Sequence, residues 1–323
     1  MITHCSLRAF ALLRYKISVS QREFVRLRRA RLRRRYRVTY GIVQMPMPSP
    51  TSYTISATVC TVAVRPTRTY GYSSPILGPV LRLRRGDRVQ MIVHNAVHFP
   101  TTVHWHGLLV PGHSDGGPQQ GINPGETWRP VLAVDQPAAT LWYHPHPHHD
   151  TARQIYLGLA GLVIVDDGDD HGLPSVLVDP MAMDPSVAVQ RRQFVLNNGI
   201  CEQRTRMSEH PDMPALIGIN GKVHDPKRID VETRLGTTEI WEILSVGMPH
   251  PFHIHGAMFR ILSLDGKPPP EHLAGLKDVV LVEDKAELLV SFTRPATREH
   301  PFMYHCHILE HEDAGMMGQY TCA

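Results

Sequence analysis

Residues 303–307 read Met-Tyr-His-Cys-His, and the His-x-His spacing of this stretch also occurs earlier in the chain. It is found at His104-Trp105-His106, at His144-Pro145-His146 and at His253-Ile254-His255. Because side chains alternate across a β-strand, both histidines of a pair face one side and the middle residue faces the other. The spacing therefore predicts four β-segments, each of which presents two imidazoles to a common side.

The four pairs divide the chain into two matching halves. The second pair follows the first after 40 residues in the first half and after 52 residues in the second half. Around them, short alternating apolar runs are separated by Gly, Pro, Asn and Asp, and helical periodicity is nowhere sustained. An all-β fold of two β-sandwich domains is the simplest architecture for this pattern.

Several strands can be located from alternation alone. Leu81 and Leu83 alternate before the turn at residues 85–87, and Val89, Met91 and Val93 alternate after it. This pattern predicts a hairpin-like pair of strands. Further strands are expected in the runs at 162–165, 240–244 and 288–292.

The chain is long enough for two domains. Its 323 residues, of which 42% are hydrophobic, can bury two ordinary cores. An acidic segment that becomes Pro- and Met-containing follows the apolar run at 162–165 and indicates a linker. We predict an Arg-rich arm or degenerate signal at 1–45, a first domain at 46–170, a linker at 171–190 and a second domain at 191–323.

The positive charge is concentrated at the N-terminus. Residues 1–40 hold twelve Lys or Arg, whereas the whole chain has a net charge of +4. Nucleic-acid binding is disfavoured, because these residues crowd into one arm instead of covering a folded face with aromatic partners. No apolar run approaches the ~20 residues that span a bilayer. Residues 20–26, Ser-Gln-Arg-Glu-Phe-Val-Arg, look like a degenerate twin-arginine signal, so we expect export to the periplasm or the extracellular space.

The histidine pairs indicate a metal cluster. Eight imidazoles are the number that three copper ions need, with two ligands for one ion and three for each of the others. The remaining histidines are expected to be ordinary surface or hydrogen-bonded residues, among them His94, His98, His113, His148, His149 and His171.

A separate mononuclear copper site is predicted around Cys306. The five cysteines are odd in number and scattered, which does not suggest a disulfide framework, and Cys306 alone lies among histidines. A blue copper takes two histidines, a thiolate and a weak axial methionine, which His250, His311 and Met316 supply together with Cys306. The corresponding positions of the first half, Thr101, Pro145, Asp150 and Ile155, cannot make such a site.

These motifs resemble the four copper motifs of the multicopper oxidase family, which includes the laccases. The resemblance implies cupredoxin-like Greek-key domains and four coppers: one type 1, one type 2 and two type 3. It also implies one-electron oxidation of phenolic or similar small donors, coupled to reduction of O2 to water. The implied roles are His104 and His253 for type 2 copper; His106, His144, His146, His255, His305 and His307 for type 3; His250, Cys306, His311 and Met316 for type 1; and Asp115 and Glu312 as proton donors.

The sequence departs from the family at its centre, because nothing between residues 172 and 193 can be a middle cupredoxin domain. Resemblance to two-domain laccases suggests a homotrimer whose copper cluster lies between chains. A linker of about 20 residues reaches roughly 60 to 70 Å, so a cluster within one chain is also allowed.

Three other functions are weighed against a laccase-like oxidase. A cuprous oxidase in copper tolerance often carries Met-rich stretches, whereas Met181 and Met183 form only a pair. A copper nitrite reductase would have its blue site in the first half. A truncated, inactive copper-binding relative is disfavoured by the complete ligand set.

Overall fold

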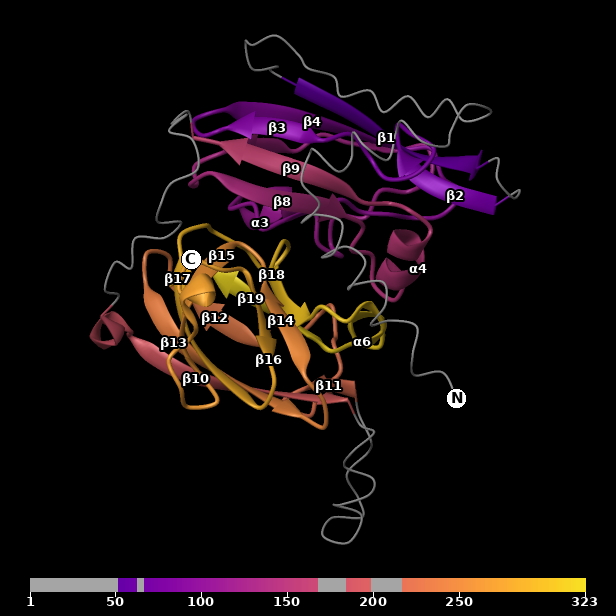
Figure 1. The fold of residues 1–323 in the computed structure, drawn as a ribbon. Helices are drawn as coiled ribbons and strands as arrows, with labels where there is room; N and C mark the ends of the chain where they lie inside the picture. The colour runs from indigo at the N-terminus through magenta and orange to yellow at the C-terminus, as the bar shows by residue number, and fades with distance from the viewer. Residues whose placement is uncertain (1–51, 63–66, 168–183, 199–216) are drawn as a thin grey trace, which may run out of the picture. The chain divides into compact units, whose positions relative to one another are not determined.

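The computed structural model describes residues 52–62, 67–167, 184–198 and 217–323, and Pro48–Ala323 form one compact unit. Strands are the main regular elements of the described part, and its helices span at most six residues, which confirms the all-β class (Figure 1). No helix among the described residues has the length and apolar character needed to cross a membrane. The N-terminal arm with its signal-like motif, His171, Met181 and Met183 lie outside the described residues.

The first half contains two sheets. One has the order β2-β1-β4-β6, with β7 also paired to β4, and the other has the order β3-β9-β8-β5. The elements are β1 (Ser52–Val62), β2 (Thr67–Tyr72), β3 (Leu81–Arg84), β4 (Arg88–Asn95), β5 (His104–His106), α3 (Gly112–Asp115), β6 (Thr127–Trp128), β7 (Val131–Ala133), β8 (Ala139–His144), α4 (Thr151–Tyr156) and β9 (Gly161–Asp166).

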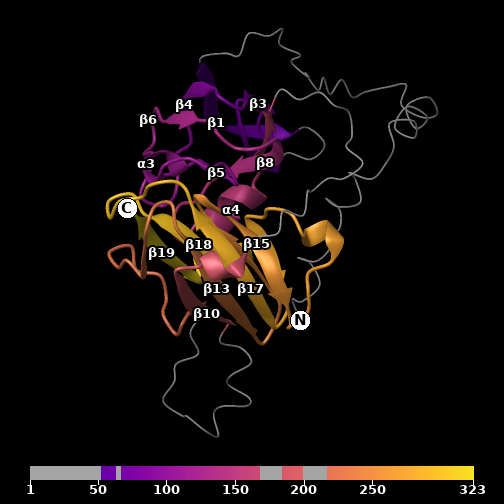
Figure 2. The ribbon, with the colours of Figure 1, turned by 90° about the vertical axis from the view of Figure 1, so that its left-hand side faces the viewer.

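The second half contains two five-stranded sheets, in the orders β11-β10-β13-β17-β15 and β12-β19-β18-β14-β16 (Figure 2). Strands β13 and β17 contain the predicted runs at 240–244 and 288–292. The elements are η1 (Pro185–Val187), β10 (Gln190–Asn198), β11 (Ile217–Ile219), β12 (Val231–Thr233), β13 (Thr238–Val246), β14 (His250–Ile254), β15 (Ala257–Leu264), η2 (Glu271–Leu273), β16 (Val279–Val282), β17 (Lys285–Phe292), β18 (Phe302–Cys306), α6 (Leu309–Asp313) and β19 (Met317–Cys322).

Each half has its own apolar core, and the histidine pairs are attached to these cores by their middle residues. Trp105 is buried in the core of the first half. Ile254 and Cys306 are buried in the core of the second half. As the alternation predicts, a strand that buries its middle side chain turns the flanking imidazoles to the opposite side.

The predicted hairpin at residues 81–93 is wrong. Leu81 on β3 pairs with Val163 on β9, whereas β4 pairs with β1, β6 and β7 in the other sheet. The turn at 85–87 therefore carries the chain from one sheet to the other. Both strands nevertheless bury alternate residues as expected. Alternation reports which side chains are buried, but it does not report the partner strand.

The prediction that every His-x-His pair lies on a strand holds fully for β5 alone. In the other three pairs, the strand ends before the second histidine: β8 ends at His144, β14 at Ile254 and β18 at Cys306. Local features explain two of these ends. Pro145 has no N–H to continue the ladder, and Gly256 turns the chain with a φ of +63°.

Candidate metal centre

Neighbouring antiparallel strands bring the histidine pairs of each half together. His104 on β5 lies opposite His144 on β8, and His253 on β14 lies opposite His305 on β18. Each half therefore presents four imidazoles at one place. All eight are buried, and ring contacts connect those of the first half to those of the second. His104 stacks on His255 at 3.7 Å between ring centroids, and His106 stacks on His253 at 3.8 Å.

Six of the eight imidazoles each contribute one ring nitrogen to one of two groups, and each group contains three nitrogens. In the first group, Nδ1 of His106 lies 3.4 Å from Nε2 of His144 and 3.2 Å from Nε2 of His307. In the second group, Nε2 of His305 lies 3.3 Å from Nε2 of His146 and 3.2 Å from Nε2 of His255. Each group takes ligands from both halves of the chain. Together the two groups contain the six histidines that the resemblance assigns to type 3 copper.

His104 and His253 are the two that remain. The Nδ1–H of His104 donates to the carbonyl of Asp115 at 2.9 Å, and that of His253 donates to the carbonyl of Asp278 at 2.8 Å. These bonds leave both Nε2 atoms with a free lone pair, and both atoms are buried without a hydrogen-bond partner. A buried acceptor without a donor costs free energy, and a metal ion would satisfy both. The residues therefore fit the predicted copper cluster.

Burial favours the neutral form of seven of the eight imidazoles, which is the form that binds a metal. It is the largest cause of a pKa far below the usual 6.5 for six of them, and the neighbouring imidazoles lower the pKa further. It also lowers the pKa of His307 to about 4. The six are His106, His144, His146, His253, His255 and His305.

The two predicted proton donors both lie against the imidazoles. One carboxylate oxygen of Asp115 lies 2.7 Å from Nδ1 of His255, and the side chain is 1% exposed. Glu312 lies 3.5 Å from Nδ1 of His146 and 3.4 Å from Nδ1 of His305. Burial raises the pKa of Glu312 well above its usual value, so the neutral acid is favoured.

Asp278 is a site residue that the sequence reasoning missed. Its carboxylate lies 3.0 Å from Nε2 of His106, while its carbonyl accepts from His253. When Nε2–H of His106 donates to this carboxylate, Nδ1 of His106 keeps its lone pair and can bind a metal ion with the other nitrogens of the first group. Such partners fix the tautomer and the ring orientation of a metal ligand. Asp278 immediately precedes β16, which pairs with β14, and no local signal in the sequence identifies that pairing.

The predicted mononuclear ligands also converge. Ligand atoms of His250, Cys306 and His311 all lie within 4.8 Å of one another, and Sγ of Cys306 is 3.7 Å from Nδ1 of His311. Met316 is buried, and its carbonyl accepts from the N–H of Cys306. The sequence reasoning missed Ser245, whose Oγ lies 2.6 Å from Nδ1 of His250.

The chemistry of Cys306 fits a metal ligand. Burial is the largest cause that raises the pKa of the thiol, and the negative charge of Glu312 adds to this effect. A thiolate at this position therefore needs a cation to stabilise it, and a coordinated metal ion provides that charge.

The corresponding place in the first half is occupied by side chains with other partners. The hydroxyl of Thr101 donates to Oε1 of Gln154 at 2.7 Å, and Asp150 forms an ion pair with Arg153. The absence of a mononuclear site from the first half stays a prediction.

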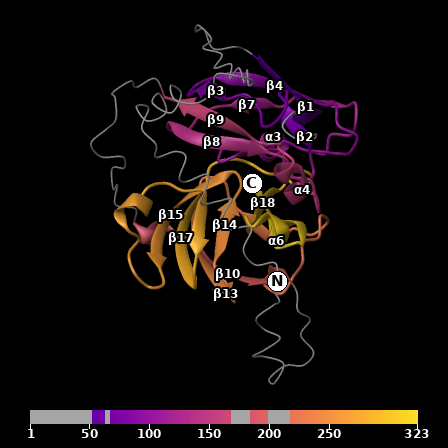
Figure 3. The ribbon, with the colours of Figure 1, turned by 45° about the vertical axis from the view of Figure 1, so that its right-hand side comes forward.

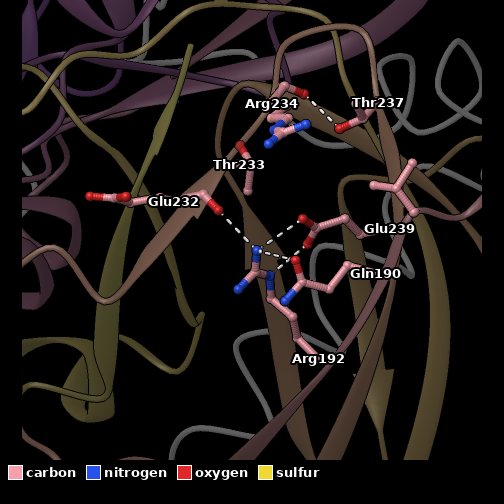
Figure 4. A pocket seen from close by; sticks show the side chains of 8 residues that line it. Gln190, Arg192, Glu232, Thr233, Arg234, Thr237 and Glu239 are labelled. Carbon is pink, nitrogen blue, oxygen red and sulfur yellow. Dashed lines mark hydrogen bonds and ion pairs between the residues drawn. The ribbon is translucent and has the colours of Figure 1, made fainter.

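A separate cavity of about 320 Å³ lies in the second half, between β10, β12 and β13 (Figure 4). Its central feature is the ion pair between Arg192 and Glu239 at 2.7 Å, in which Glu239 also accepts from the indole N–H of Trp241. Because both charged groups already have partners, this pair stabilises the packing of the sheets and leaves no free reactive group.

Comparison with known proteins agrees with this geometry. Residues 54–170 and 193–323 each match the profile of the multicopper oxidases. The protein named multicopper oxidase mco of Staphylococcus haemolyticus is 31% identical, over 78% of this chain and 83% of that protein. The alignment covers 378 positions, more than the 323 residues of this chain, so the relative contains residues that this chain lacks.

Two further relatives differ in what their names describe. A protein named cell division protein FtsP, from Xenorhabdus nematophila, is 24% identical over 77% of this chain and 84% of that protein. The solved structure of a laccase-like multicopper oxidase, CueO from Ochrobactrum sp., is 29% identical with a TM-score of 0.75, over 86% of this chain and 100% of that one. The fold class predicted from the sequence, cupredoxin-like sandwiches, is confirmed by this likeness. The matched regions and the relatives show that the chain belongs to the multicopper oxidase family.

Proposed function

We propose that the protein is a laccase-like oxidase that takes single electrons from phenolic or similar small donors and uses O2 as the acceptor. One observation carries this proposal: eight buried imidazoles from both halves converge, and Cys306 lies between two of them in the sequence. Copper bound to these residues supplies the one-electron oxidation of the donor and the four-electron reduction of O2 to water.

The chain's own residues have distinct tasks in this proposal. His250, Cys306, His311 and Met316 would hold type 1 copper, and the partly exposed ring of His311 gives donors access to it. Peptide bonds connect Cys306 directly to His305 and His307, which provides a short covalent path for electrons. Asp115 and Glu312 would supply protons beside the imidazoles, as the reduction of O2 requires, and burial favours the neutral acid at Glu312.

The assignment of the cluster follows the nitrogen groups. His104 and His253 would hold type 2 copper, and the two groups of three imidazoles would hold the type 3 pair. Because both groups combine histidines from the first and second halves of a single chain, we propose that one chain can assemble the cluster.

A cuprous oxidase is the second candidate. It is kept because the predicted copper ligands do not identify the electron donor. The name of the similar CueO structure, however, describes a laccase-like oxidase with activity towards lignin model compounds and lignosulfonate, and this chain lacks an extended Met-rich stretch. An inactive copper-binding relative is disfavoured, because the predicted imidazole and thiol ligands of both sites come together. Export remains a prediction from residues 20–26.

The proposal is tested by copper content, visible absorption and O2 uptake of the copper-loaded full chain. We expect four coppers per chain, an intense blue absorption and O2 consumption with a phenolic donor. The Cys306→Ser variant should lose the blue absorption and donor oxidation but keep three coppers. Cys322→Ser is the matched control, because Cys322 is also a free, buried thiol. Faster turnover with Cu(I) than with phenols would favour the cuprous oxidase, and fewer than four coppers would contradict both.

A further inference from the structure

A second cluster of histidines lies outside the predicted copper ligands. His148 and His149 follow the second His-x-His pair, and His224 lies in the second half, between β11 and β12. The rings of His148 and His149 stack at 3.6 Å between centroids, and the ring of His224 stands edge-on to His148 at 4.9 Å. The sequence predicts an ordinary role for all three histidines, because they lie outside the copper motifs.

Three ring nitrogens of this cluster have no hydrogen-bond partner among the described residues. They are Nε2 of His148 and both ring nitrogens of His224, and all three are buried. The side chain of His224 is only 6% exposed. Ring nitrogens in the same condition are found at His104 and His253, which fit the copper cluster. Buried polar atoms are nearly always paired in folded proteins. The unpaired nitrogens of His148 and His224 therefore indicate a site for a ligand.

The spacing of the rings agrees with a shared metal ion. The centroids of His148 and His224 are 4.9 Å apart. Pairs assigned above to a common copper have the same or similar separations, namely 4.9 Å for His146 and His305 and 5.3 Å for His250 and His311.

The surroundings favour a neutral imidazole and allow solvent to enter. Burial is the largest cause that lowers the pKa of His224 to about 4. The nearby cation Arg228 is already paired with Asp230 at 2.6 Å. His149 is exposed and is held with a φ of +67°, and its Nδ1–H donates to the carbonyl of Asp313 at 2.7 Å.

The geometry points to an accessory metal site in which His148 and His224 bind one divalent metal ion of the Zn²⁺ type. Water completes the coordination, and His149 lies at the solvent side of the site. Imidazole is a preferred ligand of these ions. Because one ligand comes from each half of the chain, the bound ion connects the two halves and stabilises the folded state.

The test uses the copper-loaded full chain and Zn²⁺ as the probe. Excess zinc is added, loose metal is removed by gel filtration, and both metals are counted per chain. Wild-type protein should retain one more zinc ion per chain than the His148→Gln or His224→Gln variant. The copper content per chain should be the same in all three proteins. His272→Gln is the matched control, because His272 is an exposed histidine of the second half. Zinc should also raise the thermal unfolding midpoint of the wild type but not of the two variants.

Equal zinc retention by wild type and both variants would overturn the proposal, as would the absence of any retained zinc. If His224→Gln does not fold, His148→Gln decides alone, since His148 is only partly buried. The copper count tests the oxidase proposal independently. A chain that binds no copper would still reveal the accessory site as a difference of one zinc between wild type and variant.

Discussion

Asp278 connects the two halves of the chain through a single residue. Its carboxylate orients His106 of the first half, and its carbonyl orients His253 of the second half. A carbonyl acceptor is provided by any residue, but only the side chain fixes the tautomer of His106. The two contacts of Asp278 can therefore be separated by mutation.

The Asp278→Ala variant should bind copper more weakly. Loss of the carboxylate frees Nε2 of His106, so the ring can adopt the wrong tautomer and orientation. The removal of such a partner typically lowers metal affinity or activity by about 10- to 100-fold. Copper retained after dialysis against graded concentrations of a chelator measures the change. Glu283→Ala, which removes an exposed acid nearby, should retain copper as the wild type does; equal retention by both variants would contradict the assigned role.

At the scale of elements, α4 of the first half packs against α6 of the second half, which contains His311 (Figure 3). Asp313 of α6 accepts hydrogen bonds from the backbone N–H groups of Thr151 and Ala152, at 2.8 Å and 3.0 Å. These are first-turn N–H groups of α4, which have no partner within the helix. The segment that carries His311 is thus fixed by a helix of the other half.

The Asp313→Ala variant should be destabilised and should have an altered mononuclear site. Removal of a capping carboxylate costs about 1 kcal/mol, measurable by urea unfolding. Because His311 lies two residues away, the visible absorption of the copper-loaded variant should broaden or shift. Asp184→Ala is the control, since Asp184 caps η1 by accepting from Ser186 at 2.8 Å. It should lower stability without changing the absorption; an unchanged spectrum in Asp313→Ala would argue against the link between the helices and the site.

A charged network lies across β10, β13 and β17. Glu242 pairs with Lys285 at 2.5 Å and lies 3.9 Å from Arg191. The hydrogen bond from Lys285 is the first cause that holds the pKa of Glu242 below its usual 4.5. A lowered pKa in the folded state stabilises the protein above pH 4.5, and this contribution disappears as the pH falls through the folded value.

Glu242→Gln should therefore lower the free energy of unfolding at neutral pH but not in acid. The effect should be under about 1 kcal/mol, because the partners are partly exposed to solvent. Urea unfolding of wild type and variant at pH 7, and again at a pH below the lowered pKa of Glu242, measures the difference. Glu283→Gln provides the exposed control. A difference that persisted in acid would show that packing rather than charge is responsible.

For the whole molecule, the question is whether the cluster forms within a chain or between chains. The structure brings all eight imidazoles together from one chain. The sequence-based prediction of a homotrimer with an interchain cluster is not tested by this observation, because identical surfaces could also be exchanged between subunits. The two arrangements differ in how defects in different halves combine.

Co-expression of His146→Ala with His305→Ala should therefore not restore O2 uptake. In an intrachain cluster, every chain keeps its own defect. In an interchain cluster, the intact first half of one chain would meet the intact second half of another, and activity would return. The wild type and each variant alone set the upper and lower limits. Restored activity in the mixed protein would establish the interchain arrangement in place of the one proposed.

Local patterns predicted much of this protein. The strand runs at 240–244 and 288–292 were located correctly, since alternation depends on side chains only two residues apart. The predicted site residues Asp115 and Glu312 lie against the imidazoles because their positions relative to the motifs are local as well. The hairpin at 81–93 was wrong, since the partner of a strand depends on residues far away in the chain.

By itself, the sequence determined the fold class and predicted the ligands, because a His-x-His pair on a strand presents both imidazoles to one side. Only the tertiary structure decided which nitrogens group together, and that Asp278 and Asp313 connect the two halves. It also brought His224 beside His148. The contacts between the two halves join residues that are 76 to 201 positions apart in the sequence, so packing alone decides them.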